Sequence, residues 1–195
     1  MRIIFATNNQ NKVEEIKSVV PENFSIITLK DADIDIDIPE PHDTLEDNAK
    51  EKAHTIYKLT GENCFSEDTG LEVACLNGAP GVKSARYAGE TKSFQDNINK
   101  LLLNLKGKEN CKAQFRTVIC LLLNGEEFLF EGICKGEITP DQKGTNGFGY
   151  DPVFIPEGAT KTFAEMTMAE KNEYSHRKKA VNKLVVFLNS LQTNK

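Results

Sequence analysis

The chain has 195 residues, of which 39% are hydrophobic and 27% are charged, and its net charge is −5. This composition is typical of a globular protein and excludes a disordered or collagen-like chain. The length favours a single domain over residues 1–195, and the acidic balance supplies no overall positive field for nucleic acid or an anionic membrane. We therefore expect no nucleic acid and no membrane as partners.

The cysteines and the first apolar residues indicate a cytoplasmic protein. The five cysteines are odd in number and lack C-x-x-C spacing, so we expect small buried thiols rather than structural zinc. The apolar run at residues 3–6 is much too short for a signal peptide. No other stretch approaches the length that spans a bilayer.

The start of the chain predicts a strand at residues 2–6, a polar loop, and a helix whose apolar residues recur at helical spacing over 13–20. The loop contains Thr7, Asn8, Asn9, Gln10, Asn11 and Lys12. The free N–H groups of the helix could bind an anion together with Lys12. Alternatively, the asparagines cap the helix and the lysine is solvated. The glycines of an ordinary P-loop are missing.

Residues 24–29 predict a second strand, and residues 31–38 alternate acids with Ala or Ile, which predicts an edge strand. Pro39 and Pro41 then end regular structure around Glu40.

Thr44 begins a capping-box pattern, and the helix predicted after it carries Lys50 and Lys52. Both lysines are interpreted as solvated charges on an exposed helical face.

Residues 66–71 read Ser-Glu-Asp-Thr-Gly-Leu after a short apolar approach, and we expect them where a strand ends. Carboxylates and hydroxyls are hard oxygen ligands, and glycine lets a ligand approach the backbone, so the segment suits a metal-assisted site. The alternative is ordinary turn chemistry. Leu71, Val73 and Cys75 continue at period two toward a glycine- and proline-bound turn at 77–81.

The middle of the chain predicts a helix capped by Ser93, followed by a hairpin. The apolar residues that this helix carries are Phe94, Ile98, Leu101, Leu102 and Leu105. Residues 113–123 and 126–130 flank Asn124-Gly125, which suits a type I′ turn. Residues 133–138 are expected to add a third strand. Together these elements predict an α/β fold, with a mixed β-sheet flanked by helices and a long antiparallel ribbon.

Residues 144–152 form a loop in which three glycines flank two aromatic residues. Its backbone could approach a flat ligand while Phe148 or Tyr150 stacks on that ligand. The alternative is a glycine-rich connection with two core aromatics.

Near the C-terminus, Ser175 can cap a final helix, which places His176 and Arg177 at its positive end, along with Lys171. These side chains would suit an anion or an electron-rich carbonyl, and the alternative is ordinary surface charge. The residues expected to pack inward are Ala180, Leu184, Phe187, Leu188 and Leu191.

Five segments occur together in the order seen in one enzyme family. They are Thr7-x-Asn9-x-x-Lys12, Asp68-Thr69-Gly70-Leu71, Gly78-Ala79-Pro80-Gly81, Phe148-Gly149-Tyr150-Asp151 and Ser175-His176-Arg177. Over nearly its whole length the chain resembles the inosine triphosphate pyrophosphatase family. The resemblance implies a two-lobed fold with a central nucleotide cleft, and a homodimer that uses Mg²⁺. It also implies hydrolysis of noncanonical purine nucleoside triphosphates (ITP, dITP, XTP) to the monophosphate and pyrophosphate.

The same resemblance implies roles for individual residues. Asp68 would orient or activate water, and Glu40 with Asp68 would hold the metal. The phosphates would be bound by Thr7, Asn8, Asn9, Gln10, Asn11, Lys12, Lys52 and Thr69. The base would be bound by Phe148, Gly149, Tyr150, Asp151, Lys171, His176 and Arg177, with Phe148 stacking on it. Thr69 replaces the usual serine and Glu67 the usual aspartate, so contact between Glu67 and the metal stays open.

The chemistry of the residues agrees with this resemblance. Several phosphate charges require Mg²⁺ and lysines to neutralise them, and a carboxylate to position water. Arg177 donates hydrogen bonds but cannot accept them, so it would favour a 6-oxo purine over adenine. Two other classes compete: an aspartic protease, because of Asp-Thr-Gly, and a nucleotide-binding sensor without turnover.

Overall fold

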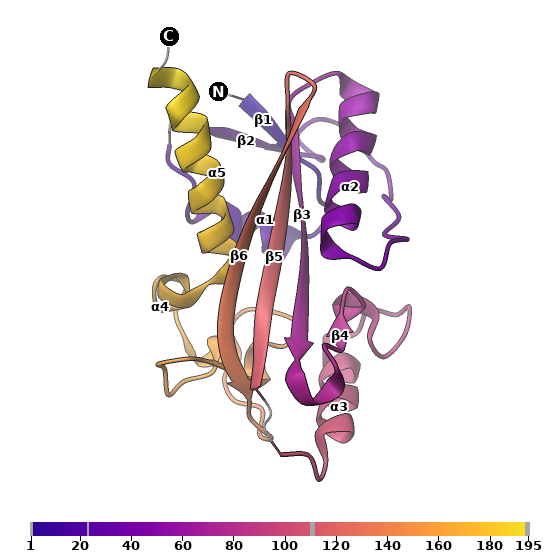
Figure 1. Cartoon of the computed structure of the whole chain (residues 1–195), viewed down its shortest axis with the longest axis vertical. Helices are drawn as coiled ribbons and strands as arrows, with labels where there is room; N and C mark the ends of the chain where they lie inside the picture. The colour runs from indigo at the N-terminus through magenta and orange to yellow at the C-terminus, as the bar shows by residue number, and fades with distance from the viewer. Residues whose placement is uncertain (1, 23, 110–111, 194–195) are drawn as a thin grey trace. The chain divides into compact units, whose positions relative to one another are not determined.

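The computed structural model describes residues 2–22, 24–109 and 112–193, and Figure 1 labels its elements. The strands are β1 (Arg2–Phe5), β2 (Ser25–Thr28), β3 (Cys64–Val73), β4 (Pro80–Gly81), β5 (Lys112–Leu123), β6 (Glu126–Ile138) and β7 (Phe154–Pro156). The helices are α1 (Gln10–Lys17), α2 (Leu45–Thr60), α3 (Phe94–Leu105), α4 (Met168–Tyr174) and α5 (His176–Thr193). No helix among the described residues is long and apolar enough to cross a membrane.

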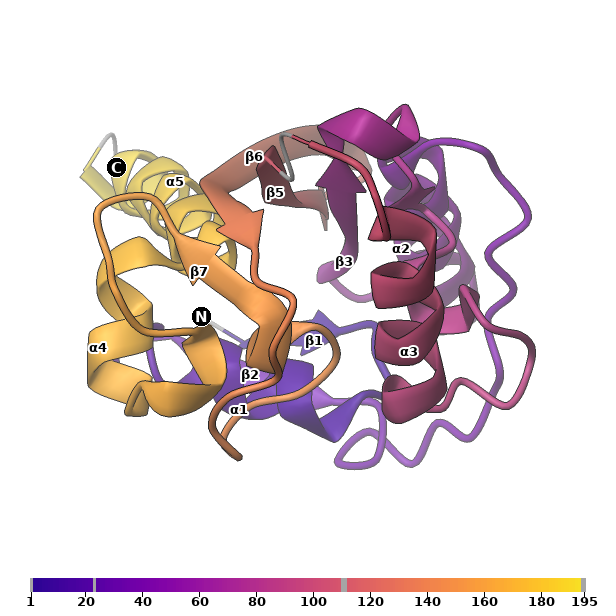
Figure 2. The ribbon, with the colours of Figure 1, turned by 90° about the horizontal axis from the view of Figure 1, so that it is seen from below.

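The strands form one mixed sheet in the order β2-β1-β3-β5-β6-β7, with β4 paired to β3. β1 runs parallel to both β2 and β3, with Phe5 opposite Thr28 on one side and Phe65 on the other. β4 and β7 pair antiparallel with β3 and β6, and Figure 2 shows β7 beside β6. The mixed α/β fold predicted from the sequence is confirmed.

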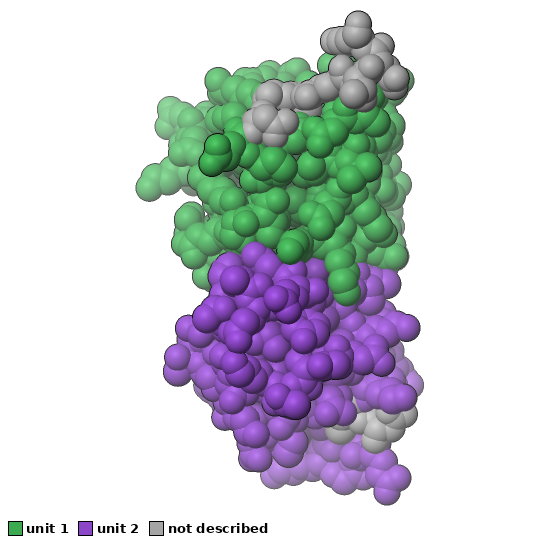
Figure 3. Space-filling model, turned by 90° about the vertical axis from the view of Figure 1, so that its left-hand side faces the viewer, with its two compact units in different colours: residues 1–68, 117–132, 177–195 green, residues 69–116, 133–176 purple. Residues whose placement is uncertain are grey.

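The chain divides into two compact units, which Figure 3 shows in different colours. Unit 1 comprises residues 1–68, 117–132 and 177–195, and unit 2 comprises residues 69–116 and 133–176. The division falls within β3, β5 and β6, so each of these strands contributes residues to both units.

In unit 1, helices cover both faces of the strands, and β3 contacts both layers. Phe65 lies in a core cluster with Val13 of α1 and Leu184 of α5, and its ring stacks on Phe5 at 4.5 Å. Cys64 and Ser66 face the other way, because their side chains donate to the carbonyls of Ala53 and Ala49 in α2. The period of two along a strand therefore alternates the α1/α5 layer with the α2 layer. Figure 1 shows α2 and α5 on different sides of these strands.

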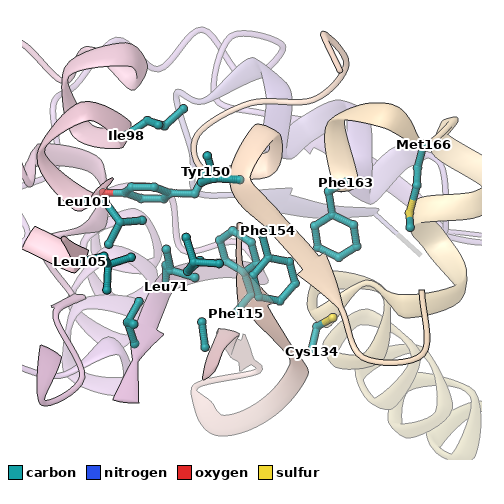
Figure 4. Close-up of a cluster of buried hydrophobic side chains, with 14 residues drawn as sticks. Leu71, Ile98, Leu101, Leu105, Phe115, Cys134, Tyr150, Phe154, Phe163 and Met166 are labelled. Atoms are coloured by element: carbon teal, nitrogen blue, oxygen red, sulfur yellow. The ribbon is translucent and has the colours of Figure 1, made fainter. Parts of the chain in front are cut away.

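Unit 2 has its own hydrophobic core, in which α3 packs against aromatic residues. Ile98, Leu101 and Leu105 of α3 belong to one cluster with Tyr150 and Phe154. Figure 4 shows Tyr150 extending toward Ile98 and Leu101 of this helix. The aromatic segment after the glycine-rich loop is therefore anchored on α3.

Local signals predicted most elements correctly. Asn124 and Gly125 have φ angles of 52° and 86°, as a type I′ turn requires, and the side chains of Thr44 and Ser93 cap α2 and α3. The third strand expected at 133–138 is instead the continuation of β6. In α5, Leu191 is 40% exposed, so the prediction that it packs inward is wrong.

The edge strand expected at residues 31–38 is also wrong, because this segment is a turn followed by irregular chain. The N–H of Thr28 donates to the Asp31 carboxylate, and the N–H of Asp31 donates to the Thr28 hydroxyl. This reciprocal pair turns the chain directly after β2. β1, the neighbour of β2, already pairs on both of its edges.

Candidate active site

The Ser-Glu-Asp-Thr-Gly-Leu segment lies inside β3 and does not follow it, which corrects the expectation of a strand end at residues 66–71. Because successive side chains of a strand point to opposite faces, Glu67 and Asp68 belong to different layers of the unit. Glu67 joins Phe65 on the α1/α5 side, and Asp68 joins Ser66 on the α2 side. The two adjacent carboxylates therefore have separate partners.

On the α2 side, Asp68 forms a cluster with Lys52 and Glu40. The ammonium of Lys52 donates to Asp68 Oδ1 at 3.0 Å and to Glu40 Oε1 at 2.8 Å. Lys52 lies on α2, which begins shortly after the proline-bounded segment that carries Glu40. Helix, irregular segment and strand thus bring two carboxylates to one cation.

The prediction that Lys52 is a solvated lysine is wrong, since only 6% of this residue is exposed. Burial alone would lower its pKa, but Asp68 and Glu40 outweigh burial and raise it, so the lysine stays charged. For Asp68 burial dominates and raises the pKa, although Lys52 and Lys12 oppose it. A carboxylate with a raised pKa accepts a proton more readily, which suits a general base.

Glu40 and Asp68 have the donor chemistry for Mg²⁺. Both are carboxylates that converge on one cation, and Mg²⁺ typically takes one or two protein carboxylates together with water and substrate phosphates. Among the described residues, no group of three or more His, Cys, Asp or Glu side chains could hold a metal ion. The predicted pair therefore fits a Mg²⁺ shared with substrate better than a closed all-protein site.

On the α1/α5 side, Glu67 is the centre of a buried charged network. Arg177 Nε and Nη2 donate to the two oxygens of Glu67 at 2.8 and 3.0 Å, and Lys12 Nζ lies 3.1 Å from Oε1. Arg177 Nη1 also donates to Glu15 of α1. Burial alone would raise the pKa of Glu67, but Arg177 and Lys12 outweigh burial and lower it to about 2. Glu67 is therefore a stable anion.

In this network the carboxylate of Glu67 binds two cations on the face opposite Asp68, and contact between Glu67 and a metal stays an open prediction. The network also reveals Glu15, which the sequence analysis did not single out and which is only 4% exposed. A signal was present: Glu15 lies at i+3 from Lys12, on the same stripe of α1. The role of Arg177 in reading a base stays a prediction, and in this structure its guanidinium is bound to Glu67 and Glu15.

The predicted phosphate-binding residues 7–12 span the end of the loop before α1 and the first turn of this helix, and the structure shows what several of them do locally. Asn9 caps α1 by accepting from the N–H groups of Asn11 and Lys12, while Thr7 Oγ1 accepts from the N–H of Asn9. Asn8 donates to the carbonyl of Ile36, and Gln10 contacts Glu14. The capping alternative for Asn9 is thus confirmed. Lys12 is the residue of this segment that reaches the buried carboxylates.

In unit 2, Asp151 organises the residues predicted to read a base. Its Oδ2 accepts from Lys171 Nζ at 2.6 Å and from the N–H of Phe148 at 2.9 Å. Lys171 Nζ also lies 5.5 Å from the ring centroid of Phe148. Gly147, with φ of +74°, is required beside them, because a Cβ there would lie 2.0 Å from the Asp151 carboxylate. A carboxylate, an ammonium and a half-buried aromatic ring thus meet at one place.

Tyr150 is 4% exposed and its hydroxyl donates to the carbonyl of Ser84, while its contact with a base stays a prediction. It belongs to the core of unit 2, so Phe148 is the aromatic residue of this loop that remains accessible for stacking. His176 is buried as well, with its ring stacked on Phe115 at 4.7 Å. Gly149, beside Phe148, has φ of +62°.

Thr69 directly follows Asp68 in β3 and is half-buried. The turn at Gly78-Ala79-Pro80-Gly81 packs against Gly70, the residue after Thr69 in β3. A Cβ on Gly70 would lie 2.7 Å from the carbonyl oxygen of Gly81, so the Asp-Thr-Gly glycine is needed for this close strand contact.

The fold and these clusters define an α/β protein that carries one carboxylate–lysine site in a sheet strand and another beside a glycine-rich aromatic loop. A family model described as the Ham1 family matches residues 3–187, and the chain belongs to that family.

Named relatives cover nearly the whole chain. A "dITP/XTP pyrophosphatase" of Flavobacterium johnsoniae is 53% identical over 96% of this chain and 98% of its own. One from Porphyromonas gingivalis is 48% identical over 96% and 97%. Solved structures agree: the Staphylococcus aureus Ham1 protein has a TM-score of 0.88 at 39% identity, covering 97% of this chain and 99% of its own. A HAM1 protein from Coxiella burnetii has a TM-score of 0.89 at 34% identity, with the same coverage. The family match gives the aspartic protease alternative no support.

Proposed function

We propose that the chain is a nucleoside triphosphate pyrophosphatase that hydrolyses noncanonical purine nucleoside triphosphates, namely dITP, ITP and XTP, to the monophosphate and pyrophosphate. The observation that carries this proposal is the Asp68–Lys52–Glu40 cluster in a chain of the Ham1 family. The names of the relatives support the substrate class.

In this mechanism unit 1 supplies the groups that act on the triphosphate. The carboxylate of Asp68, with its raised pKa, takes a proton from water as the water oxygen attacks the α-phosphorus. The bond from that phosphorus to the bridging oxygen breaks, and pyrophosphate leaves. Lys52 and Lys12 offset the negative charge of the phosphates. Glu40 and Asp68 would hold Mg²⁺, which supplies further charge neutralisation when bound.

Unit 2 supplies the groups for the base. Lys171 has three donors and no acceptor, so its ammonium can pair with a 6-oxo group but not with the 6-amino group of adenine. Asp151 fixes this ammonium at 2.6 Å, and Phe148 offers an aromatic face for stacking. A base that leaves a buried donor unpaired is strongly disfavoured. These contacts support a preference for hypoxanthine and xanthine over adenine.

Three further properties belong to the proposal. Magnesium dependence is supported by the paired carboxylates, a homodimer by the family resemblance, and a cytoplasmic location by the free thiols of the four cysteines that the structure describes. Light scattering on purified protein would give the oligomeric state.

The test is pyrophosphate release from the triphosphates of inosine, xanthosine, adenosine and guanosine, with Mg²⁺ present, after chelation, and after Mg²⁺ is restored. We expect fast release from the first two, loss on chelation and recovery on restoration. Equal rates for all four would overturn the base-reading roles. Binding of inosine triphosphate without release would instead establish a sensor.

A further inference from the structure

Phe94 occupies an unusual place in α3. It is the first residue of the helix, and it continues the stripe formed by Ile98, Leu101 and Leu105 by one more turn. Those three residues lie in the core of unit 2, but Phe94 is 43% exposed and lies outside the core cluster. Core packing therefore does not account for Phe94.

The contact that Phe94 makes is with Phe148. The two ring centroids are 6.0 Å apart and the ring planes are tilted by 47°, within the range of favourable aromatic pairs. α3 thus contacts the segment around the glycine-rich loop through Phe94 at Phe148 and through its core residues at Tyr150.

The ring of Phe148 needs such a contact because its own backbone does not hold it. Gly147 and Gly149 flank it with φ angles of +74° and +62°, and glycine restricts the chain least of all residues. The hydrogen bond from its N–H to Asp151 fixes the main chain but leaves the side-chain torsions free. Lys171 over the ring and Phe94 beside it are two contacts that help to set the direction of the ring.

We infer that Phe94 is a positioning residue for base recognition: it holds the Phe148 ring at the angle that a purine base requires for stacking. This inference rests on the proposed function, since Phe148 must contact the base. Phe94 then acts through Phe148 and not through the phosphates. An aromatic pair of this kind corresponds to about a two- to twelvefold change in affinity.

The test compares steady-state kinetics with inosine triphosphate for the wild type and four variants: Phe94→Ala, Phe94→Tyr, Phe148→Ala and the double variant Phe94→Ala/Phe148→Ala. Leu103→Ala is the matched control, because Leu103 lies on the same helix and is 62% exposed. We expect Phe94→Ala to raise KM about two- to tenfold with kcat nearly unchanged, and Phe94→Tyr to restore it. The control should behave as wild type.

Two product inhibitors separate positioning from a general structural effect. Phe94→Ala should weaken inhibition by inosine monophosphate, which carries the base, and leave inhibition by pyrophosphate unchanged. The double variant should be no worse than Phe148→Ala alone, since the two residues act in series. If Phe148→Ala raises KM but Phe94→Ala does not, this inference is overturned while the proposed function stands. If Phe148→Ala has no effect on KM, base stacking in the proposed function fails as well.

Discussion

Glu67 and Asp68 are adjacent in the chain and both buried, yet their pKa values are shifted in opposite directions. Glu67 meets Arg177 and Lys12 on one face of β3, and its pKa falls to about 2. Asp68 shares Lys52 with Glu40 on the other face, and burial raises its pKa. The ratio of cations to carboxylates differs between the two clusters. One strand therefore separates an anion that holds structure together from a carboxylate suited to proton transfer.

The largest effect should follow from Asp68→Asn. An amide of the same shape cannot accept a proton from water, so we expect the rate of pyrophosphate release to fall about 10²- to 10⁴-fold. Because burial opposes the charge of Asp68, urea unfolding should show little loss of stability.

Glu72→Gln is the control for that experiment, because Glu72 lies on the same strand, is half-buried and bonds to Gln114. It should leave the rate unchanged. A rate for Asp68→Asn within a few-fold of wild type would remove Asp68 from the mechanism.

Glu67→Gln should damage folding more than any change on the other face of β3. Removing this carboxylate leaves Arg177 buried with one carboxylate fewer, and the loss of one partner from a buried ion pair costs about 3–5 kcal/mol. Urea unfolding monitored by circular dichroism measures the cost. If Glu67→Gln were as stable as Asp68→Asn, the distinction between the two faces would not hold.

The free energy of unfolding should also depend on pH in opposite ways for Glu67 and Asp68. Glu67 has a folded-state pKa of about 2, below the ordinary value of 4.5, so its contribution is complete above about pH 4.5. It is lost as the pH falls toward 2, and the shift corresponds to about 3 kcal/mol. Asp68 has the opposite sign, because its raised pKa favours the folded state at low pH.

Urea unfolding of wild type and Glu67→Gln at several pH values would isolate the contribution of the Glu67 charge to stability. The gap in stability between the two proteins should be widest near pH 6 and should narrow steadily below pH 4.5. A gap independent of pH would show that the Glu67 charge is not responsible.

The smallest effect is expected where a charge pair is exposed. Lys50 lies two residues before Lys52 on α2, and its ammonium is 3.1 Å from Glu127, with about a third of each side chain exposed. Solvent screens such pairs, so Lys50→Ala should leave both the urea midpoint of unfolding and the rate of pyrophosphate release nearly unchanged. A loss as large as that of Glu67→Gln would contradict the role assigned to burial.

The sequence predicted the parts of the fold that depend on neighbouring residues. Thr44 and Ser93 cap their helices, and Asn124-Gly125 forms its turn, because these signals act within a few residues. The strand expected at 31–38 is wrong because the Thr28 and Asp31 side chains form a turn directly after β2, which the alternation of residue types does not show. β3 was predicted to end early, although the alternation at Leu71 and Val73 continued from Phe65 and Glu67.

The sequence selected the candidate site residues, but it did not show which of them pair with one another. Lys52 and Lys50 look alike in the sequence, and only the position of Asp68 beneath α2 separates a buried lysine from an exposed one. Arg177 reaches Glu67 and Glu15 from 110 and 162 residues away, and no local pattern contains that information. The sequence offered Tyr150 and Phe148 equally as the residue that stacks on a flat ligand, and the structure distinguishes them, because Tyr150 is buried in the core while Phe148 is half-buried beside Phe94.

Two hydrogen bonds from β3 to α2 fix the register between this strand and this helix. Cys64 and Ser66 are two residues apart, about 6.6 Å along a strand, while their acceptors Ala53 and Ala49 are four apart, about 6.0 Å along a helix. These two spacings nearly match, so the same register places Asp68, two residues further along β3, at the level of the first turn of α2. The long side chain of Lys52, which leans toward the N-terminus of the helix, reaches the Asp68 carboxylate there. An insertion of one residue in α2 would displace the acceptor carbonyls relative to their donors in β3. The irregular segment at 31–38 has no such helix–strand spacing to preserve. The number of residues in α2 is thus constrained, because two of its carbonyls must stay opposite their donors in β3.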